Sequence, residues 1–432
     1  GSNGGLAANY TLSGGTHQLT VNQRPLNATL ARQYDGTTTA AGSTLSSLDA
    51  LQGGETLTLS GSGTAAGANV ANGITMSSNG NLALADGTGL ASNYSLNSTV
   101  INIAKRVLNS SGSKLYDANT NALAGAITLS NLVSGEALNH SGTATISSVN
   151  AGSYTITNLA GITIADGSGG TASNYTLTGG THNFTVNQRL LNATLARQYD
   201  GTTASAGSTL SSFDALQAGE TLTLSGSGTA ASTNVANGIS VSSLGTLALV
   251  NGTGLASNYS LNSASLNITQ RILNSSGSKT YDANTNALAA DITLGNLVSG
   301  EALNHSGTAT IGSANAGSYT ISNLTGITIA DGSGGAASNY TLTGGTHNFT
   351  VNRRVVGVSG TRLYDATTNA VASDLSTHAN LVGSETLNLS GTGTIASKDV
   401  GSSKTVTVGT LALADGSNGG LAANYTLSGG TH

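Results

Sequence analysis

The sequence contains no cysteine and no tryptophan, and it has a single proline, Pro25, among 432 residues. Without cysteine the chain forms neither disulfide bonds nor thiolate metal sites. The absence of cysteine does not exclude export. A single proline excludes proline-rich linkers. No run approaches the roughly 18 apolar residues of a membrane-spanning helix, and no signal peptide is recognisable. We therefore expect no membrane span.

Charge is also scarce. Charged residues make up 8% of the chain, against about 25% in ordinary soluble proteins. The net charge of -5 is small for this length, so electrostatic capture of nucleic acid or of an anionic membrane is not expected. The apolar content of 38% predicts a folded chain in spite of its 60 glycines.

What the sequence does contain is a repeated signature: a basic residue, a spacer, Tyr, Asp, and then Gly or Ala. Successive copies lie 82 or 83 residues apart, and such a period indicates an array of like modules. The Tyr-Asp pairs are Tyr34-Asp35, Tyr116-Asp117, Tyr199-Asp200, Tyr281-Asp282 and Tyr364-Asp365. An arginine lies ten positions before each of these tyrosines: Arg24, Arg106, Arg189, Arg271 and Arg354. One glutamate follows each tyrosine by 20 or 21 positions, and these are the only glutamates in the sequence: Glu55, Glu136, Glu220, Glu301 and Glu385.

An Asn-Tyr pair closes each repeat, at Tyr94, Tyr175, Tyr259, Tyr340 and Tyr425, with an earlier copy at Tyr10. We place the boundaries just before the first arginine. Residues 1–22 then form the C-terminal strands of a preceding repeat, and the modules are 23–104 (module 1, type A), 105–187 (module 2, type B), 188–269 (module 3, type A), 270–352 (module 4, type B) and 353–432 (module 5, type C). Module 5 lacks its last strand, whose equivalent is Gln18 to Asn22. Residues 1–17 and 416–432 have the same sequence.

Alternation of polar and apolar residues over four to six positions, interrupted by glycine-rich turns, predicts half-buried strands. Only Leu45 to Leu51 favours one short helical turn. The spacing predicts an all-β tandem array of small β-sandwich-like modules, each folding by itself. Because the last strand of one module runs almost directly into the next, we expect an extended rod. The alternative, a parallel β-solenoid, would show a repeat near 20 residues.

The signature is interpreted as structural. Arg32 and Tyr34 share one face of a strand. Asp35 begins a turn, and its carboxylate accepts hydrogen bonds from the backbone N–H groups of that turn. Arg24 lies on the same face, so Glu55 is the expected partner of these cations. We assign no catalytic, cofactor-binding or metal-binding residue, because no acid/base pair, phosphate loop or histidine cluster has the required spacing.

The order Tyr-Asp-Gly-Thr-Thr, Gly-Glu-Thr-Leu, an Asn-Val or Asp-Val-Gly segment, and Asn-Tyr resembles the YDG-type repeat of large bacterial surface proteins, along essentially the whole chain. It is similar to stalk regions of filamentous-haemagglutinin-like adhesins, which are exported by two-partner secretion. Ala replaces Gly after Asp in three of five signatures, and Ala fits a type I turn. The resemblance implies an extracellular or cell-surface location and no catalytic residues.

We therefore expect a non-enzymatic structural stalk or fibre that supports surface attachment, cell–cell adhesion or a biofilm matrix, without cofactors. Two partners stay open: other copies of the chain, through exposed strand edges, and surface polysaccharide. The alternative function, a multivalent carbohydrate-binding array, needs an exposed aromatic platform in every module, with Tyr34 and Tyr94 as the best candidates. An enzyme is the third hypothesis, which lacks a clustered acid/base set.

Overall fold

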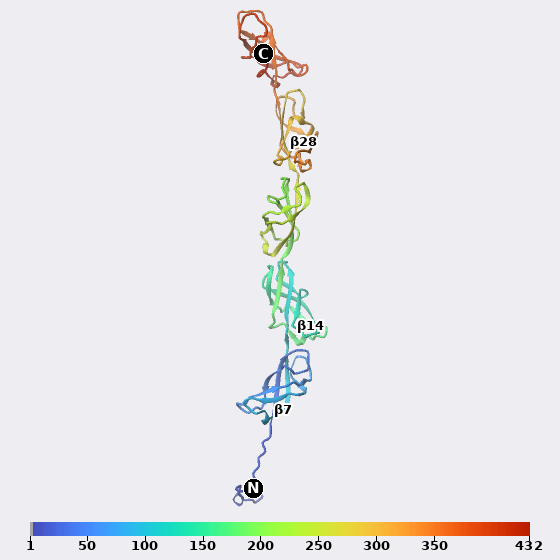
Figure 1. Ribbon diagram of the computed structural model, residues 1–432, viewed down its shortest axis with the longest axis vertical. Coiled ribbons are helices and arrows are strands. Elements are labelled where there is room, and N and C mark those ends of the chain that lie inside the picture. Colours follow the sequence, from blue (N-terminus) through green and yellow to red (C-terminus); the bar gives the residue numbers. More distant parts are fainter. Residues whose placement is uncertain (1–2) are drawn as a thin grey trace. The chain divides into compact units, whose positions relative to one another are not determined.

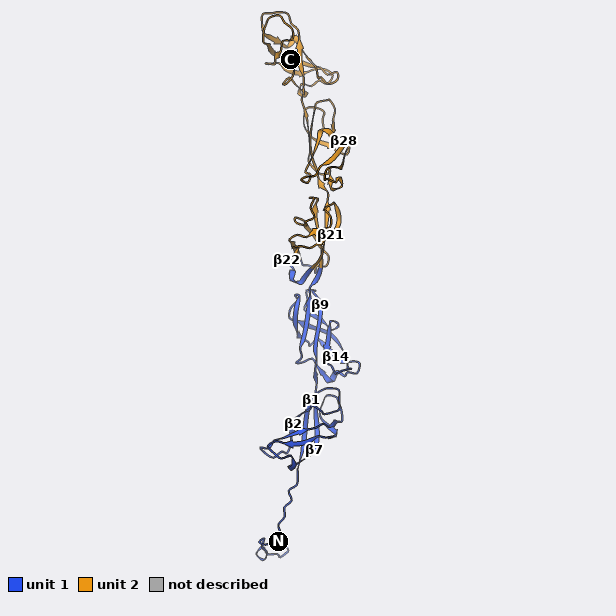
Figure 2. Cartoon of the chain, in the orientation of Figure 1, with its two compact units in different colours: residues 1–190, 217–220, 253–260 blue, residues 191–216, 221–252, 261–432 orange. Residues whose placement is uncertain are grey.

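The computed structural model describes residues 3–432, and in that range it contains β-strands and short 3-10 turns but no α-helix. The chain divides into two compact units (Figure 2). Unit 1 comprises Gly1–Leu190, Gln217–Glu220 and Thr253–Ser260, and unit 2 comprises Leu191–Leu216, Thr221–Gly252 and Leu261–His432. Over the described range, no helix has the length and apolar character needed to cross a membrane. The expected all-β tandem array is confirmed.

Module 1 is built around two neighbouring parallel strands, its first and its last. Its strands are β1 (Arg24–Gln33), β2 (Thr44–Leu48), β3 (Leu57–Ser60), β4 (Thr64–Ala65), β5 (Ala71–Ser78), β6 (Ala83–Asp86) and β7 (Tyr94–Ala104), after the turn η1 (Ala7–Asn9) and with the turn η2 (Ala91–Asn93). One sheet has the order β2-β1-β7-β5-β4, and β3 pairs with β6. The expected helical turn at Leu45 to Leu51 is wrong, because pairing with β1 draws residues 44–48 into a strand.

Module 3 repeats this type A arrangement, with a sheet of order β18-β17-β23-β21-β20 and a β19-β22 pair. Its elements are β17 (Arg189–Gln198), β18 (Thr209–Phe213), β19 (Leu222–Ser225), β20 (Thr229–Ala230), β21 (Ala236–Ser243), β22 (Ala248–Asn251), η5 (Ala256–Asn258) and β23 (Tyr259–Thr269).

Modules 2 and 4 share the type B arrangement. The elements of module 2 are β8 (Arg106–Val107), β9 (Asn109–Leu115), β10 (Asn121–Leu123), η3 (Ala124–Ala126), β11 (Ile127–Ser130), β12 (Leu138–Ile146), β13 (Gly152–Asn158), β14 (Ile162–Asp166), η4 (Ala172–Asn174), β15 (Tyr175–Thr176) and β16 (His182–Asn187). Those of module 4 are β24 (Arg271–Ile272), β25 (Asn274–Thr280), β26 (Asn286–Leu288), η6 (Ala289–Asp291), β27 (Ile292–Gly295), β28 (Leu303–Ile311), β29 (Gly317–Asn323), β30 (Ile327–Asp331), η7 (Ala337–Asn339), β31 (Tyr340–Thr341) and β32 (His347–Asn352). The main sheets have the orders β10-β12-β13-β16-β9-β11 and β26-β28-β29-β32-β25-β27.

Module 5 has shorter ladders. Its elements are β33 (Arg354–Val355), β34 (Gly357–Gly360), β35 (Asn369–Val371), η8 (Ala372–Asp374), β36 (Leu375–His378), β37 (Leu387–Ser390), β38 (Thr392–Ile395), β39 (Val406–Thr407), β40 (Ala412–Asp415), η9 (Ala422–Asn424) and β41 (Tyr425–Thr426). They pair as β33-β41, β34-β36, β35-β38-β39 and β37-β40.

The first and last long strands of a module run in the same direction. β1 and β7 are parallel with Leu30 opposite Ile101, and in module 2 β9 and β16 are parallel with Gly112 opposite Phe184. Module 4 repeats this with β25 and β32. The chain therefore enters such a module at one end and leaves it at the other (β7, β14 and β28 mark modules 1, 2 and 4 in Figure 1).

Every ladder in the described residues joins strands of one module, which excludes the parallel solenoid as the fold. The side-chain cores are less separate than the backbone ladders. One cluster of buried residues contains Tyr34 and Ile101 of module 1 together with Leu108 and Tyr175 of module 2. Apolar and aromatic side chains therefore pack across the boundary between modules 1 and 2. That each repeat folds by itself stays a prediction.

Candidate functional site at the module junctions

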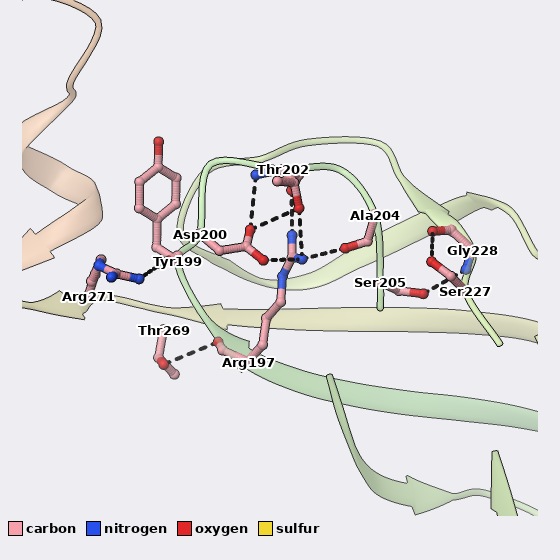
Figure 3. A network of polar contacts seen from close by, with 10 residues as sticks. All are labelled: Arg197, Tyr199, Asp200, Thr202, Ala204, Ser205, Ser227, Gly228, Thr269 and Arg271. Carbon is pink, nitrogen blue, oxygen red and sulfur yellow. Dashed lines mark hydrogen bonds and ion pairs between the residues drawn. The ribbon is translucent and has the colours of Figure 1, made fainter. Parts of the chain in front are cut away.

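The Tyr-Asp signature forms a closed turn held by an ion pair. In module 1, Arg32 Nη1 lies 2.5 Å from Asp35 Oδ2 and donates to the carbonyl of Thr39 at 2.6 Å. Asp35 Oδ1 accepts the backbone N–H of Thr37 at 2.9 Å, as expected from the sequence. Figure 3 shows the same network in module 3, where Arg197 pairs with Asp200 and donates to the carbonyl of Thr202, while the N–H of Thr202 donates to Asp200.

The expected ion pair between the arginines and the lone glutamate is wrong. Each ion pair found in residues 3–432 joins a Lys or Arg to the aspartate three positions later: Arg32–Asp35, Lys114–Asp117, Arg197–Asp200, Lys279–Asp282 and Arg362–Asp365. The basic residue pairs with this aspartate because both lie at the same tight turn, so forming the ion pair orders few additional residues.

The residue after each aspartate has a left-handed backbone, which corrects the type I interpretation. Its φ is 77° at Gly36 and 76° at Gly201, and it is 60° at both Ala118 and Ala283 and 63° at Ala366. Alanine in this region costs on the order of 1 kcal/mol relative to an unstrained residue. The turn therefore has the same shape with either residue, and glycine adopts its left-handed backbone at a lower conformational cost.

The glutamate joins two tyrosines from consecutive modules. At the first junction, Tyr34 OH of module 1 donates to Glu136 Oε1 of module 2 at 2.6 Å, and Tyr175 OH of module 2 donates to Glu136 Oε2 at 2.6 Å. The backbone N–H of Val133 donates to the Tyr175 hydroxyl at 3.1 Å. The two rings meet edge to face with centroids 5.4 Å apart. Tyr34 is 5% exposed and Tyr175 is 1% exposed. We call this arrangement the Tyr–Glu–Tyr lock.

The lock recurs inside both units. In unit 1, Tyr116 and Tyr259 both donate to Glu220. In unit 2, Tyr199 and Tyr340 donate to Glu301, each at 2.6 Å. A further copy has Tyr281 and Tyr425 on Glu385, at 2.8 and 2.5 Å. Each of these ring pairs has a centroid distance of 5.4 Å and an edge-to-face geometry.

A buried asparagine forms the second half of each junction. Asn174, which precedes Tyr175, accepts the backbone N–H of Val70 at 2.9 Å and donates to Asn69 Oδ1 at 3.0 Å. Both partners belong to module 1. The equivalent asparagines are Asn258, Asn339 and Asn424, which accept the N–H groups of Ala151, Val235 and Ala316. Each of these buried asparagines therefore adds a hydrogen bond to the backbone of the preceding module.

The arginines ten positions before each signature tyrosine have two placements. Arg106 donates to the carbonyl of Asn131 at 2.6 Å and to the carbonyl of Tyr34 at 3.4 Å. Arg271 reaches the carbonyl of Tyr199 in the same way (Figure 3), and Arg354 reaches that of Tyr281. In the type A modules, Arg24 and Arg189 instead donate to glutamine side chains, each at 3.1 Å.

The electrostatics of the lock keep its phenols neutral. Burial, reinforced by the hydrogen bond to Glu136, raises the pKa of Tyr34 to about 12. Burial, reinforced by the hydrogen bonds to Glu385, raises the pKa of Tyr281 and of Tyr425 to about 12. A carboxylate facing two protonated phenols accepts two charge-assisted hydrogen bonds, which are stronger than neutral ones. The glutamate therefore links two modules, and each oxygen of its carboxylate accepts a hydrogen bond from one of the two tyrosines.

The outermost copies are half-locks. Glu55 accepts a hydrogen bond from Tyr94, but no tyrosine of a preceding module reaches it among residues 3–432. Tyr364 is 59% exposed and Tyr10 is 78% exposed. Tyr34 and Tyr94, the aromatic candidates for carbohydrate stacking, are buried. No cluster of three or more metal-ligating side chains occurs in the described part of the chain.

The sequence identified the tyrosines and glutamates, but it did not identify their pairing across modules or the contacts of the asparagines in the Asn-Tyr pairs. The available signal was one of number, since each module carries one glutamate, with two carboxylate oxygens, and two recurrent tyrosines.

The family model described as the YDG domain matches residues 16–101, 104–182, 187–266, 265–347 and 350–432. No curated protein matches the chain. Since these matches cover nearly the whole sequence, the chain belongs to the YDG domain family as a tandem array of its domains.

Proposed function

We propose that this chain is a non-enzymatic structural stalk of a bacterial extracellular adhesin, which supports cell-surface attachment, cell–cell adhesion or a biofilm matrix. The observation that carries the proposal is the Tyr–Glu–Tyr lock, repeated at the junctions inside both units. A stalk needs joints that resist bending, and a buried lock at each joint serves that need.

The connections between modules support the same role. β7 ends at Ala104 and β8 begins at Arg106, so a single residue separates the last strand of module 1 from the first strand of module 2. The other boundaries are equally short: β16 to β17, β23 to β24, and β32 to β33. Such joints lack the flexible residues of an ordinary linker.

The energy of one lock is sufficient to matter. Two hydrogen bonds to a carboxylate contribute about 1.5–3 kcal/mol each, and an edge-to-face aromatic pair adds about 0.5–1.5 kcal/mol. A lock is thus worth several kcal/mol before the cost of ordering its side chains. Opening one joint costs a sizeable share of the about 5–15 kcal/mol that stabilises an ordinary domain.

The exterior location rests on the family resemblance together with composition. A chain without cysteine unfolds and refolds across a membrane without premature disulfide formation. Its weakly charged surface of hydroxyl and amide groups suits a spacer that avoids nonspecific electrostatic binding.

Small-angle scattering of the purified chain tests the mechanical part of the proposal. End-to-end modules, each containing strands of about ten residues, predict a maximum dimension on the order of 150–200 Å. Glu136→Ala and Glu301→Ala together should broaden the distance distribution, whereas Glu55→Ala should leave it unchanged. A compact wild-type particle would contradict the stalk. Binding to immobilised surface polysaccharides by the wild type, abolished by changes on an exposed face, would favour the carbohydrate-binding alternative.

A further inference from the structure

The main sheet of module 4 has a solvent face that carries hydroxyl and amide groups and no charge. Four neighbouring strands, β27, β25, β32 and β29, form this surface, which we call the polar face. Side chains alternate between the two sides of a strand. The outward ones are Thr293 and Gly295 on β27, Asn274, Ser276, Ser278 and Thr280 on β25, Asn348, Thr350 and Asn352 on β32, and Ser318, Thr320 and Ser322 on β29. Lys279 and Tyr319 lie on the opposite side, where Lys279 pairs with Asp282 and Tyr319 packs against the core.

The outward side chains form rows that run across the strands. Ser276 lies opposite Thr293 on one side and opposite Asn348 on the other, and Asn348 lies opposite Thr320. Neighbouring strands are about 4.8 Å apart, so this row of four residues spans about 14 Å. All four residues are exposed. The row therefore offers solvent a regular line of hydrogen-bond donors and acceptors.

A groove of about 340 Å³ opens on the polar face. Its lining includes Asn274, Ser276 and Asn348 from the outward side of the sheet. Gly295, opposite Asn274, also lines it, and the residue at the equivalent position of module 2 is Ser130. Pockets that bind small molecules have volumes of about 300–1,000 Å³. The groove is therefore large enough to hold a small polar group such as one sugar residue.

Module 2 contains the same row of residue types. Ser111 lies opposite Thr128 and Asn183, and Asn183 lies opposite Thr155. All four are exposed, as they are in module 4. The polar face is thus a feature of both type B modules.

We propose that the polar face of the type B modules binds an uncharged polysaccharide, with one sugar residue in the groove of module 4. An anionic polymer would need a cluster of Lys and Arg, and a protein partner would need Trp, Tyr or Arg anchors. The polar face has none of these residues. Hydroxyl and amide groups both donate and accept hydrogen bonds, as sugar hydroxyls do. Each site is weak without an aromatic platform, and a polymer that repeats the same sugar compensates through its high local concentration.

This inference goes beyond the stalk proposal, because a stalk needs no ligand, and its failure would leave the stalk intact. Native electrophoresis of the full chain through gels that contain dextran or mannan tests it, since the net charge of -5 drives migration. We expect at least one of these neutral polysaccharides to retard the chain and polygalacturonate, an anionic one, to have no effect. The dependence of mobility on polysaccharide concentration gives the dissociation constant.

Substitutions in the row identify the site. Ser276→Ala with Asn348→Ala, combined with Ser111→Ala and Asn183→Ala in module 2, should weaken binding roughly tenfold by removing hydrogen-bonding groups. The fold should persist because all four positions are exposed. The matched control replaces exposed hydroxyls of β19 in module 3, with Thr223→Ala and Ser225→Ala, and should leave binding unchanged.

Gly295→Gln tests the groove separately from the row. A Cβ at Gly295 would meet only Asn274, at 3.9 Å, so the larger side chain fits the backbone and fills the groove. In a chain that already carries Ser111→Ala and Asn183→Ala, this change should weaken the remaining binding severalfold. The proposal would be overturned by a chain that neither neutral polysaccharide retards, by retardation in polygalacturonate alone, or by retardation that the changes in the row do not alter.

Discussion

Removing one glutamate from a junction should destabilise two modules at once, and Glu136→Ala is the sharpest case. Glu136 accepts hydrogen bonds from Tyr34 of module 1 and Tyr175 of module 2, each at 2.6 Å. The alanine variant leaves two buried hydroxyl groups without their acceptor. A buried unsatisfied polar group costs about 1–3 kcal/mol, so for two hydroxyl groups we expect a loss of about 2–6 kcal/mol, shared between the modules.

Module 1 provides the matched control. Glu55 accepts a hydrogen bond from Tyr94 of its own module, and no tyrosine of a preceding module reaches it among residues 3–432. Glu55→Ala should therefore cost about half as much, in module 1 alone. Glu136→Gln keeps one acceptor oxygen and should give an intermediate loss.

Hydrogen exchange read by mass spectrometry is the appropriate assay, because a multi-module array does not unfold in one step and a single unfolding free energy is not defined for it. Exchange reports the local opening free energy of each module. Glu136→Ala should accelerate exchange in β1, β7 and β15 and leave module 4 unchanged. Equal effects of Glu136→Ala and Glu55→Ala, or an effect of Glu136→Ala confined to module 2, would refute the lock as a connection between modules.

Three further predictions follow from the same geometry. The pKa of Tyr281 is raised to about 12, above about 10 in an unfolded chain; its contribution to stability is therefore fully present below about pH 10 and is lost as the pH rises through about 12. A pH titration should show the rise in tyrosinate absorbance and the acceleration of hydrogen exchange at the junction over the same pH range. Loss of protection at the junction below pH 9 would contradict this. Tyr281→Phe removes a buried donor to Glu385 and should cost about 1–3 kcal/mol, whereas Tyr364→Phe, at an exposed tyrosine, should change monomer stability by less than about 0.5 kcal/mol in thermal unfolding. Asn339→Ala leaves the N–H of Val235 without its acceptor and should cost about 1–3 kcal/mol, measured by exchange at that amide, whereas Asn93→Ala should cost clearly less.

Local features of the fold were predictable because they depend on residues close together in the chain. The alternation of Thr and Leu in 56–60 identifies a strand, observed as β3, Leu57–Ser60. The carboxylate of Asp35 and the N–H of Thr37 are two residues apart, so the turn follows from the signature alone. The error at Leu45 to Leu51 shows the limit: pairing with β1 overrode a weak local preference for a helical turn.

The sequence by itself determined the module period, the all-β class and the identity of the recurrent tyrosines and glutamates, because repetition and period-two patterning are properties of the chain. Only the tertiary structure decided what the glutamates contact. Tyr34 and Glu136 are 102 positions apart and belong to different modules, and periodicity within a module carries no information about which face meets its neighbour. The nearest cations bonded to the aspartates in their own turns instead. The glutamate carboxylate therefore accepts hydrogen bonds from the two tyrosines that chain direction and strand register bring together at each junction.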